Sequence, residues 1–188
     1  MTATLLGVDE ALTRVVAACA ALPAQSVSLD AALGRVLAQP VHCAHPLPLF
    51  DQSGVDGYAV HHADLASLPA RLPLGATMAA TAQDHRPTLA CGTAARILTG
   101  GLLPLAADTV VRQELTRRDG DHVVVLEAVE RGADIRRIGE EVAVGALIAE
   151  AGALVRPGLL GALALAGAHQ VSVRTQPRVV VLITGDEV

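Results

Sequence analysis

Residues 48–60 read PLFDQSGVDGYAV and contain both aromatic residues of the chain, Phe50 and Tyr58. Two acids and two glycines separate the rings. An Asp-Gly pair favours a tight turn that can hold a carboxylate at the surface while a ligand approaches the backbone. Residues 57–60 then predict a short strand. Two interpretations stay open: a ligand-binding loop that uses Asp56, or a structural turn with Tyr58 packed beneath it.

On the N-terminal side of this stretch, the pattern predicts two helices and then a passage between structural units. Over residues 8–22 the apolar side chains fall on one helical face. A second, shorter helix is expected from Ser28, a good N-terminal cap, to about Leu37. Prolines then recur through residues 40–48, which predicts an extended strip joining two units.

On the C-terminal side, the pattern predicts mainly short strands and one further helix. The helix is expected from Pro157 to Ala166, because proline is favoured in a first turn and Gly167 suits the C-terminal cap. The last strand is apolar and runs into the turn Thr184–Glu187, which is typical of the opening of a parallel α/β unit. We therefore expect the N-terminal part of a longer protein. The expected strands are 96–99, 108–114, 122–129, 144–149, 171–173 and 178–183.

Composition excludes several classes of protein. The chain has 188 residues, of which 52% are hydrophobic, and a formal net charge of −5. A binder of duplex nucleic acid would show a basic face, so we expect no nucleic-acid partner. No apolar run reaches the roughly 18 residues needed to cross a bilayer, and the N-terminus does not resemble a signal peptide. The sequence therefore predicts a cytoplasmic protein without a membrane partner.

Two further segments could carry chemistry. Residues 99–104 read TGGLLP, and consecutive glycines after a strand can expose backbone N–H groups to an anion. Residues 134–141 read DIRRIGEE, in which two arginines could bind phosphate and two acids could hold Mg²⁺. Each has a plainer alternative: 99–104 could be an ordinary turn, and 134–141 could be a loop that pairs its own charges.

Taken together and in this order, these segments resemble the molybdopterin molybdenumtransferase family, which includes the bacterial MoeA-type enzymes and the E domain of gephyrin. The family pattern F-D-N-S-A-M-D-G-Y-A-V is similar to residues 50–60. The patterns R-I-x-T-G-A-P-L-P and G-A-D-A-V-V-x-Q-E resemble residues 96–104 and 106–114. The pattern I-R-x-x-G-E-D is matched by 135–141, and P-R-V-A-V-L-x-T-G-D-E-L by 177–188.

The resemblance implies an α+β fold made of several regions. Residues 1–43 with about 145–176 would form an N-terminal discontinuous region of helices with a strand–helix return. Residues 44–144 would be a mixed α/β region inserted into it. Residues 177–188 would be the first strand of a truncated α/β, molybdopterin-binding domain. Family members are elongated homodimers, and molybdopterin adenylyltransferase is the expected upstream partner.

The resemblance also implies an activity: insertion of molybdate into adenylylated molybdopterin, with Mg²⁺-dependent release of AMP. Glu141 stands where the family usually has Asp, which could disturb a Mg²⁺ site. The magnesium ligands would be Asp56 and Glu141. The catalytic residues carried over are Asp56, Thr99, Glu140 and Glu141. The residues expected to contact the cofactor are Ser53, Gly100, Arg136, Arg137 and Asp186.

Two other functions remain possible from the sequence. The chain could be a catalytically inactive module of the same family that serves in dimerisation or assembly. It could also be a generic nucleotide-binding α/β protein, but the absence of a Gly-Lys-Ser/Thr phosphate loop disfavours this.

Overall fold

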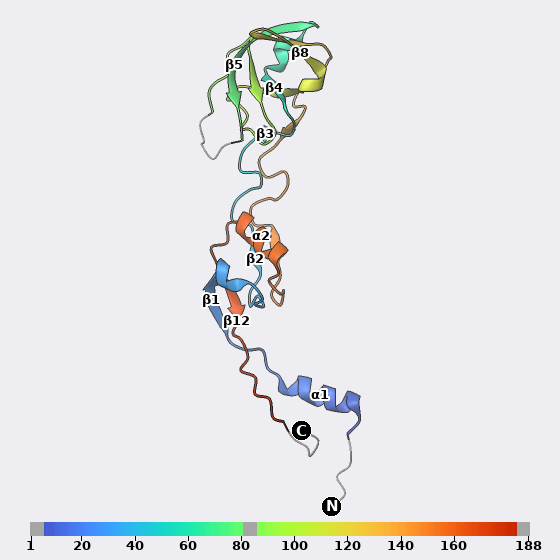
Figure 1. The fold of residues 1–188 in the computed structure, drawn as a ribbon, viewed down its shortest axis with the longest axis vertical. Helices are drawn as coiled ribbons and strands as arrows, with labels where there is room; N and C mark the ends of the chain where they lie inside the picture. Colours follow the sequence, from blue (N-terminus) through green and yellow to red (C-terminus); the bar gives the residue numbers. More distant parts are fainter. Residues whose placement is uncertain (1–5, 81–85, 184–188) are drawn as a thin grey trace, which may run out of the picture. The chain divides into compact units, whose positions relative to one another are not determined.

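The computed structural model describes residues 6–80 and 86–183. The chain divides into two compact units. We call the first, Met1–Ala44 with Leu147–Val188, the discontinuous unit, and the second, His45–Ala146, the inserted unit. Figure 1 shows the few helices in the first and most of the strands in the second.

Two short antiparallel pairings join the two halves of the discontinuous unit. β1 pairs with β12 from Ala24 opposite Arg174 to Ser28 opposite Gln170, and β2 pairs with β11. Segments far apart in sequence thereby close one small core. The elements are α1 (Val8–Ala18), β1 (Ala24–Ser28), η1 (Leu29–Ala32), β2 (Val41–His42), β11 (Leu147–Ala149), α2 (Pro157–Leu165) and β12 (Gln170–Arg174).

Helix α2 confirms its prediction closely. Pro157 stands in the first turn, where a missing N–H costs no helical hydrogen bond. Just beyond the helix, Gly167 adopts φ +84°, a left-handed conformation that glycine reaches without steric cost. Leu163 is completely buried and packs with Val155 and Val173 in the core of the unit.

Helix α1 is present but shorter than the predicted 8–22, since it ends at Ala18 and the chain turns extended at Cys19. None of its residues is buried. The apolar face that predicted the helix is exposed, with Leu12, Val15 and Val16 each at least 60% accessible. The periodicity therefore identified the helix correctly, but no described residue covers its apolar side.

The second predicted helix, from Ser28 to Leu37, is wrong. Only one 3₁₀ turn forms, and Gly34 then takes φ +74°. The chain beyond it pairs with a distant segment instead: Leu37 N–H donates to the carbonyl of Ala153, and Val36 bridges Leu154. Tertiary pairing thus outweighs the local helical pattern of this segment.

The inserted unit is built on a six-stranded mixed sheet with the order β7-β4-β6-β5-β9-β8. All neighbours are antiparallel except β5 and β6, which are parallel. A separate two-stranded pairing joins β3 to β10. The elements are β3 (Gln52–Ser53), β4 (Gly57–Val60), η2 (His62–Leu65), β5 (Ala70–Met78), β6 (Ala94–Ile97), β7 (Thr109–Arg112), η3 (Gln113–Leu115), β8 (Thr116–Asp119), β9 (His122–Val125) and β10 (Ile135–Arg136).

Strand β4, predicted from residues 57–60, lies inside the sheet and is buried along its whole length. Tyr58 and Val60 pack into a cluster on one face, and Ala59 packs into a second cluster on the other. A Cβ atom on Gly57 would lie 2.3 Å from the carbonyl oxygen of Val111 on β7. Only glycine fits this position, which explains why Asp-Gly precedes Tyr58.

The strands predicted at 96–99, 108–114 and 122–129 are confirmed as β6, β7 and β9. β6 begins and ends two residues earlier than expected, and β7 and β9 are shorter than expected. The sequence missed β8, whose residues Thr116–Asp119 are polar and exposed and therefore lack an apolar pattern. A tight turn at residues 119–121 joins β8 to β9, with Gly120 at φ +57°.

The predicted buried strand at 178–183 is wrong. Residues 175–183 form no strand, and the side chains of Val179–Ile183 are 74–81% exposed. An apolar strand is stable only when neighbouring strands and a covering layer bury it, and no described residue does so here. The predicted turn at Thr184–Glu187 lies outside the described residues.

The protein is an α+β chain with few helices and a curled mixed sheet, as predicted. Among residues 6–80 and 86–183, no helix has the length and apolar character needed to cross a membrane.

Candidate functional site

Three segments that the sequence singled out meet in the inserted unit. β3 pairs with β10, so that Ser53 lies opposite Ile135, and Gly54 N–H donates to the carbonyl of Asp134. The 99–101 turn joins them, because Gly100 N–H donates to the carbonyl of Ser53. We call residues 51–56, 98–101 and 134–141 together the loop cluster.

Asp56 is a partly exposed acid of this cluster, and Thr99 fixes its carboxylate. Both the backbone N–H and the hydroxyl of Thr99 donate to Oδ1 of Asp56, each at 2.8 Å. The pKa of Asp56 lies below its usual range. The hydrogen bond from the Thr99 N–H lowers it most, the bond from the Thr99 hydroxyl lowers it next, and the guanidinium of Arg96 adds to this effect. Asp56 is therefore ionised at neutral pH and has a fixed orientation.

The glycines that follow Thr99 do not form an anion cradle in this arrangement. Gly100 donates its N–H to Ser53, and Gly101 donates to the carbonyl of Leu98. A Cβ on Gly101 would lie 2.8 Å from two carbonyl oxygens, so this glycine permits close packing of the turn. The plainer interpretation, a structural turn, fits these contacts, and the turn serves to present Thr99 to Asp56.

Ser53, which the resemblance placed at the cofactor, is 1% exposed. Its hydroxyl donates to the carbonyl of Val55 at 2.6 Å and accepts a bond from the N–H of the same residue. This side chain closes the turn that precedes Asp56, and its burial leaves no route for direct contact with a ligand.

The loop 134–141 pairs its charges only in part within itself, because Arg137 pairs with Asp51 and Asp134 with Arg112, both outside the loop. Arg136 forms an ion pair with Glu141 at 2.7 Å, and Glu140 accepts the backbone N–H of Arg137 at 2.7 Å. The Arg136 and Glu141 side chains are about half exposed, so water screens this pair. No contact in the structure joins Glu140 or Glu141 to Asp56 among the described residues.

Sequence reasoning missed Asp51, which anchors the same loop. Its carboxylate accepts from the guanidinium of Arg137 at 2.7 Å and from the N–H of Ile138 at 2.9 Å. Burial raises the pKa of Asp51, but these two donors outweigh burial and bring that pKa below its usual range. The signal was its place beside Phe50 in the most informative segment.

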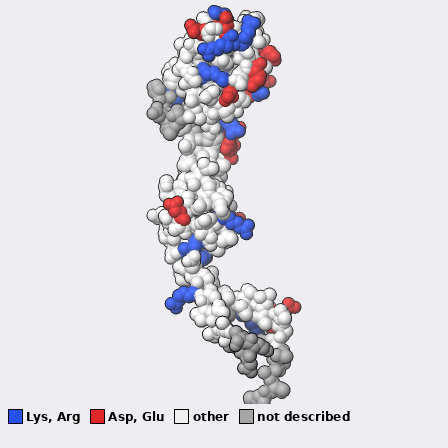
Figure 2. All heavy atoms as spheres, viewed as in Figure 1, with Lys and Arg blue, Asp and Glu red and all other residues white. Residues whose placement is uncertain are grey.

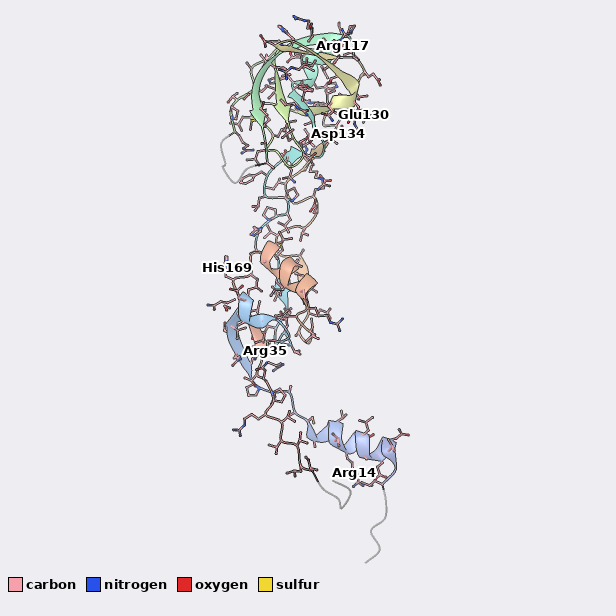
Figure 3. All side chains as sticks on the ribbon, viewed as in Figure 1. Arg14, Arg35, Arg117, Glu130, Asp134 and His169 are labelled. Carbon is pink, nitrogen blue, oxygen red and sulfur yellow. The ribbon has the colours of Figure 1, made fainter. Side chains whose placement is uncertain are left out.

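Asp134 was also missed as a functional position. It takes φ +54° and binds Arg112 of β7 through two hydrogen bonds of 3.1 and 2.7 Å. Its label in Figure 3 lies on the side of the inserted unit nearer β3. A non-glycine residue in this conformation is uncommon, and here the bidentate pair with Arg112 holds it.

The predicted magnesium ligands do not make a metal site from the described residues alone. No group of three or more His, Cys, Asp or Glu side chains that could hold a metal occurs among residues 6–80 and 86–183. Oδ1 of Asp56 is committed to Thr99, and Glu141 is paired with Arg136. Asp186, the remaining predicted acid, lies outside the described residues.

A cavity of about 260 Å³ lies elsewhere in the inserted unit, between β5 and the segment around Leu89. Its described lining is apolar or uncharged, with prolines at positions 73, 87 and 104. None of the predicted site residues lines it, so the cavity gives no support to the chemistry expected at Asp56.

Sequence comparison finds relatives with one recurring name. The chain is 36% identical to the molybdopterin molybdenumtransferase of Nostoc sp. over 164 residues, which cover 86% of this chain and 38% of that protein. It is 37% identical to molybdopterin molybdenumtransferase 2 of Mycobacterium tuberculosis, covering 86% and 41% of the two. The chain therefore spans about two fifths of the length of these relatives.

Structure comparison agrees. A crystal structure of the molybdopterin biosynthesis MoeA protein of Pyrococcus horikoshii aligns with a TM-score of 0.74 at 31% identity, covering 82% of this chain and 42% of that one. A second structure of the MoeA protein aligns at 0.76 and 26% identity over 93% and 45%. Residues 6–167 match the family described as the MoeA N-terminal region (domain I and II). The chain belongs to the MoeA N-terminal family.

Proposed function

We propose that the chain acts in molybdenum cofactor biosynthesis, as the N-terminal part of a molybdopterin molybdenumtransferase that inserts molybdate into adenylylated molybdopterin and releases AMP. The observation that carries this proposal is the partly exposed Asp56 carboxylate, fixed by two hydrogen bonds from Thr99 in a segment matched by the family. The names of the relatives supply the reaction class.

In this proposal Asp56 is the residue that touches the reactants. An ionised carboxylate of fixed direction can accept a proton or hydrogen bond from a reacting group, or align that group for attack. Thr99 acts through Asp56, because both of its donors are already committed to that carboxylate. The remaining half of the site would come from residues other than 6–80 and 86–183, including the segment that contains Asp186.

Magnesium is proposed only as a requirement of the whole gene product. The described residues do not fit a magnesium site by themselves. A homodimer and molybdopterin adenylyltransferase as the upstream partner complete the proposal. A protein that consumes an adenylylated substrate needs an enzyme that transfers the adenylyl group to molybdopterin.

The test replaces Asp56 by Asn in the full-length gene product. AMP release from adenylylated molybdopterin and molybdate is measured, together with the yield of active molybdenum cofactor. Because the amide keeps the shape and loses the charge, we expect turnover to fall about 100-fold, the scale of a lost positioning group. Asp119→Asn is the matched control, since Asp119 is exposed, also has a lowered pKa, and lies on β8.

Undiminished turnover in Asp56→Asn would refute the assignment of the site. A fall of the same size in Asp119→Asn would show that the loss reflects the fold or net charge rather than the chemistry at Asp56.

A second candidate function is an assembly module without turnover. The exposed apolar face of α1 favours it, because an amphipathic helix normally buries that face against a partner. A gene product that forms dimers but releases no AMP under the conditions above would support this alternative.

A further inference from the structure

The side chain of Arg96, on β6, contacts the backbone beside Asp56. It lies opposite Tyr58 in the β4–β6 register, and its guanidinium stacks over the Tyr58 ring at 5.1 Å from the centroid. One terminal nitrogen donates to the carbonyl of Gly57 at 2.8 Å, and the other donates to Oε1 of Gln113 at 2.9 Å. The Arg96 guanidinium therefore links its own strand, β6, to β4 and to η3.

Arg96 and its partner Gln113 bind the backbone at Asp56 and at the residue that follows it. The carbonyl of Gly57, the next residue, accepts from Arg96. The carbonyl of Asp56 itself accepts from the N–H of Gln113 at 3.0 Å, and Gln113 is the residue whose amide Arg96 binds. Thr99 follows Arg96 by three positions, in the turn just after β6, so this strand and the turn that follows it supply both the backbone contact and the carboxylate contact.

Arg96 differs in its partners from five other arginines of the inserted unit. Arg71, Arg112, Arg131, Arg136 and Arg137 each form an ion pair with a carboxylate. Among the described residues no carboxylate forms an ion pair with Arg96, whose partners are a carbonyl, an amide and a ring. Its positive charge is therefore not neutralised by contact, and the nearest functional acid that feels it is Asp56.

The geometry requires arginine rather than any cation. A guanidinium can donate in two directions within one plane while its face covers an aromatic ring. A lysine ammonium at the same point carries the charge but has no plane to stack and no fixed fork. The role of the side chain can therefore be separated into charge and geometry by substitution.

We propose that Arg96 is a positioning residue for Asp56: its guanidinium locks the Gly57 carbonyl, the Tyr58 ring and Gln113 so that the Asp56 carboxylate stays aligned with Thr99 and toward the reactants. This inference rests on the proposed function, since it assigns Arg96 a role in presenting the acid of that site.

The experiment uses three variants: Arg96→Gln removes charge and fork, Arg96→Lys keeps the charge, and Arg117→Gln is the control. Arg117 loses the same charge from β8, and its label in Figure 3 lies on the opposite side of the inserted unit from Asp134 of the loop cluster. Carbon-13 NMR of the 188-residue chain follows the titration of the Asp56 carboxyl and the amide shift of Thr99. Turnover of the full-length gene product gives kcat and KM.

We expect the Asp56 pKa to rise in Arg96→Gln, to rise less in Arg96→Lys, and to stay unchanged in Arg117→Gln. The Thr99 amide resonance should move in both Arg96 variants. We expect kcat to fall about 10-fold in both, with little change in KM, because misalignment of a reacting group slows the chemical step. Arg96→Lys also serves as the variant that folds if Arg96→Gln does not.

An unchanged Asp56 titration and Thr99 amide in the Arg96 variants would overturn the inference whatever the turnover. Wild-type kcat in both variants would overturn it equally. Full turnover in Asp56→Asn would instead overturn the proposed site, and with it the need for a positioning residue.

Discussion

The two units of the chain differ in the kind of side chain that they expose. On the face shown in Figure 2, charged side chains gather on the inserted unit, whereas the discontinuous unit presents a mostly uncharged surface. The inserted unit pairs its charges internally, for example Asp51 with Arg137 and Asp134 with Arg112. The discontinuous unit exposes apolar side chains instead, on α1 and along Val179–Ile183.

This difference indicates that the two units have separate roles. A strand buried on both faces, with the adjoining loops tied by ion pairs and turns, can hold Asp56 and Thr99 in a fixed geometry. Exposed apolar surface of this extent is uncommon on an isolated domain and marks a place where other protein packs. Chemistry would thus be prepared in one unit and association in the other, and the following substitutions test this division.

Gly57→Ala should have the largest effect, and it should be confined to the inserted unit. The new Cβ would lie 2.3 Å from Val111 O and 3.0 Å from its carbonyl carbon, and backbone atoms cannot swing aside. We expect a loss of about 3 kcal/mol or more in unfolding free energy, the upper end for overpacking a core. Tyr58, the chain's one tyrosine, reports this unit by fluorescence during urea unfolding.

Gly75→Ala is the matched control, since its Cβ would meet only the Ala94 carbonyl at 3.8 Å. If Gly57→Ala proved as stable as Gly75→Ala, the tight β4–β7 contact would not be what holds the Asp56 turn.

Leu163→Ala should be the second largest change and should act in the discontinuous unit. Leu163 is completely buried, and its truncation leaves a cavity beside Val155 and Val173. We expect a loss of about 2–3 kcal/mol, the lower part of the range for leucine, because the partly buried Leu159 and Leu160 can move toward the gap. Amide hydrogen exchange at β1 and β12 would measure the loss.

Leu165→Ala in the same helix is the control, because Leu165 is 65% exposed and its truncation should change stability by no more than about 0.5 kcal/mol. Equal losses in the two variants would mean that α2 is not packed through Leu163.

How well each element could be predicted from the sequence depends on whether its apolar face is covered within the chain. Elements whose apolar face is covered within the chain were predicted well: β4, β6 and α2 all have such a face. The prediction failed where the outcome depended on pairing between distant segments, as at residues 28–37, which pair with 153–155. It failed again at 178–183, where an apolar strand has no described partner.

The candidate site divides in a comparable way. Asp56 and Thr99 were predicted from motif resemblance, and the structure brings them into contact. Asp51 and Arg96 were not predicted, because their roles arise from hydrogen bonds across strands that local spacing does not reveal. The burial of Ser53 was likewise not predicted, because a motif shows which residues recur but not which of them are buried.

A charged α1 surface should change association and leave stability almost untouched. In Leu12→Glu with Val16→Glu, two exposed apolar side chains of α1 become acidic. We expect the unfolding free energy to stay within about 0.5 kcal/mol of the parent, the usual range for surface changes. If the exposed face mediates the proposed homodimer, sedimentation equilibrium should show a shift from dimer to monomer.

Thr13→Glu, on the same helix, adds charge without removing an apolar side chain and should leave association unchanged. A dimer that persists in the double variant would remove α1 from the association surface and direct the search to other exposed apolar residues, such as Val179–Ile183.

Thr99→Val should produce the smallest effect, visible mainly at acid pH. It removes the hydroxyl that donates to Asp56 but keeps the backbone N–H, which donates at 2.8 Å. The pKa of Asp56 should therefore rise only part of the way toward its usual value. A carboxyl whose pKa is lower in the folded chain stabilises the fold above its unfolded pKa, and this contribution is lost as pH falls through the folded pKa.

The expected pH profile follows from that sign. Above the ordinary aspartate range Asp56 is fully ionised, so the parent keeps the whole benefit of the hydroxyl bond; the variant lacks it there, and the gap closes as acid protonates Asp56. Thr116→Val is the control, because its hydroxyl donates to a carbonyl and should give a gap independent of pH. A Thr99→Val gap that stayed constant down through the acid range would show that the hydroxyl orients the turn without acting on the Asp56 charge, and the inserted unit would then hold its acid through the backbone alone.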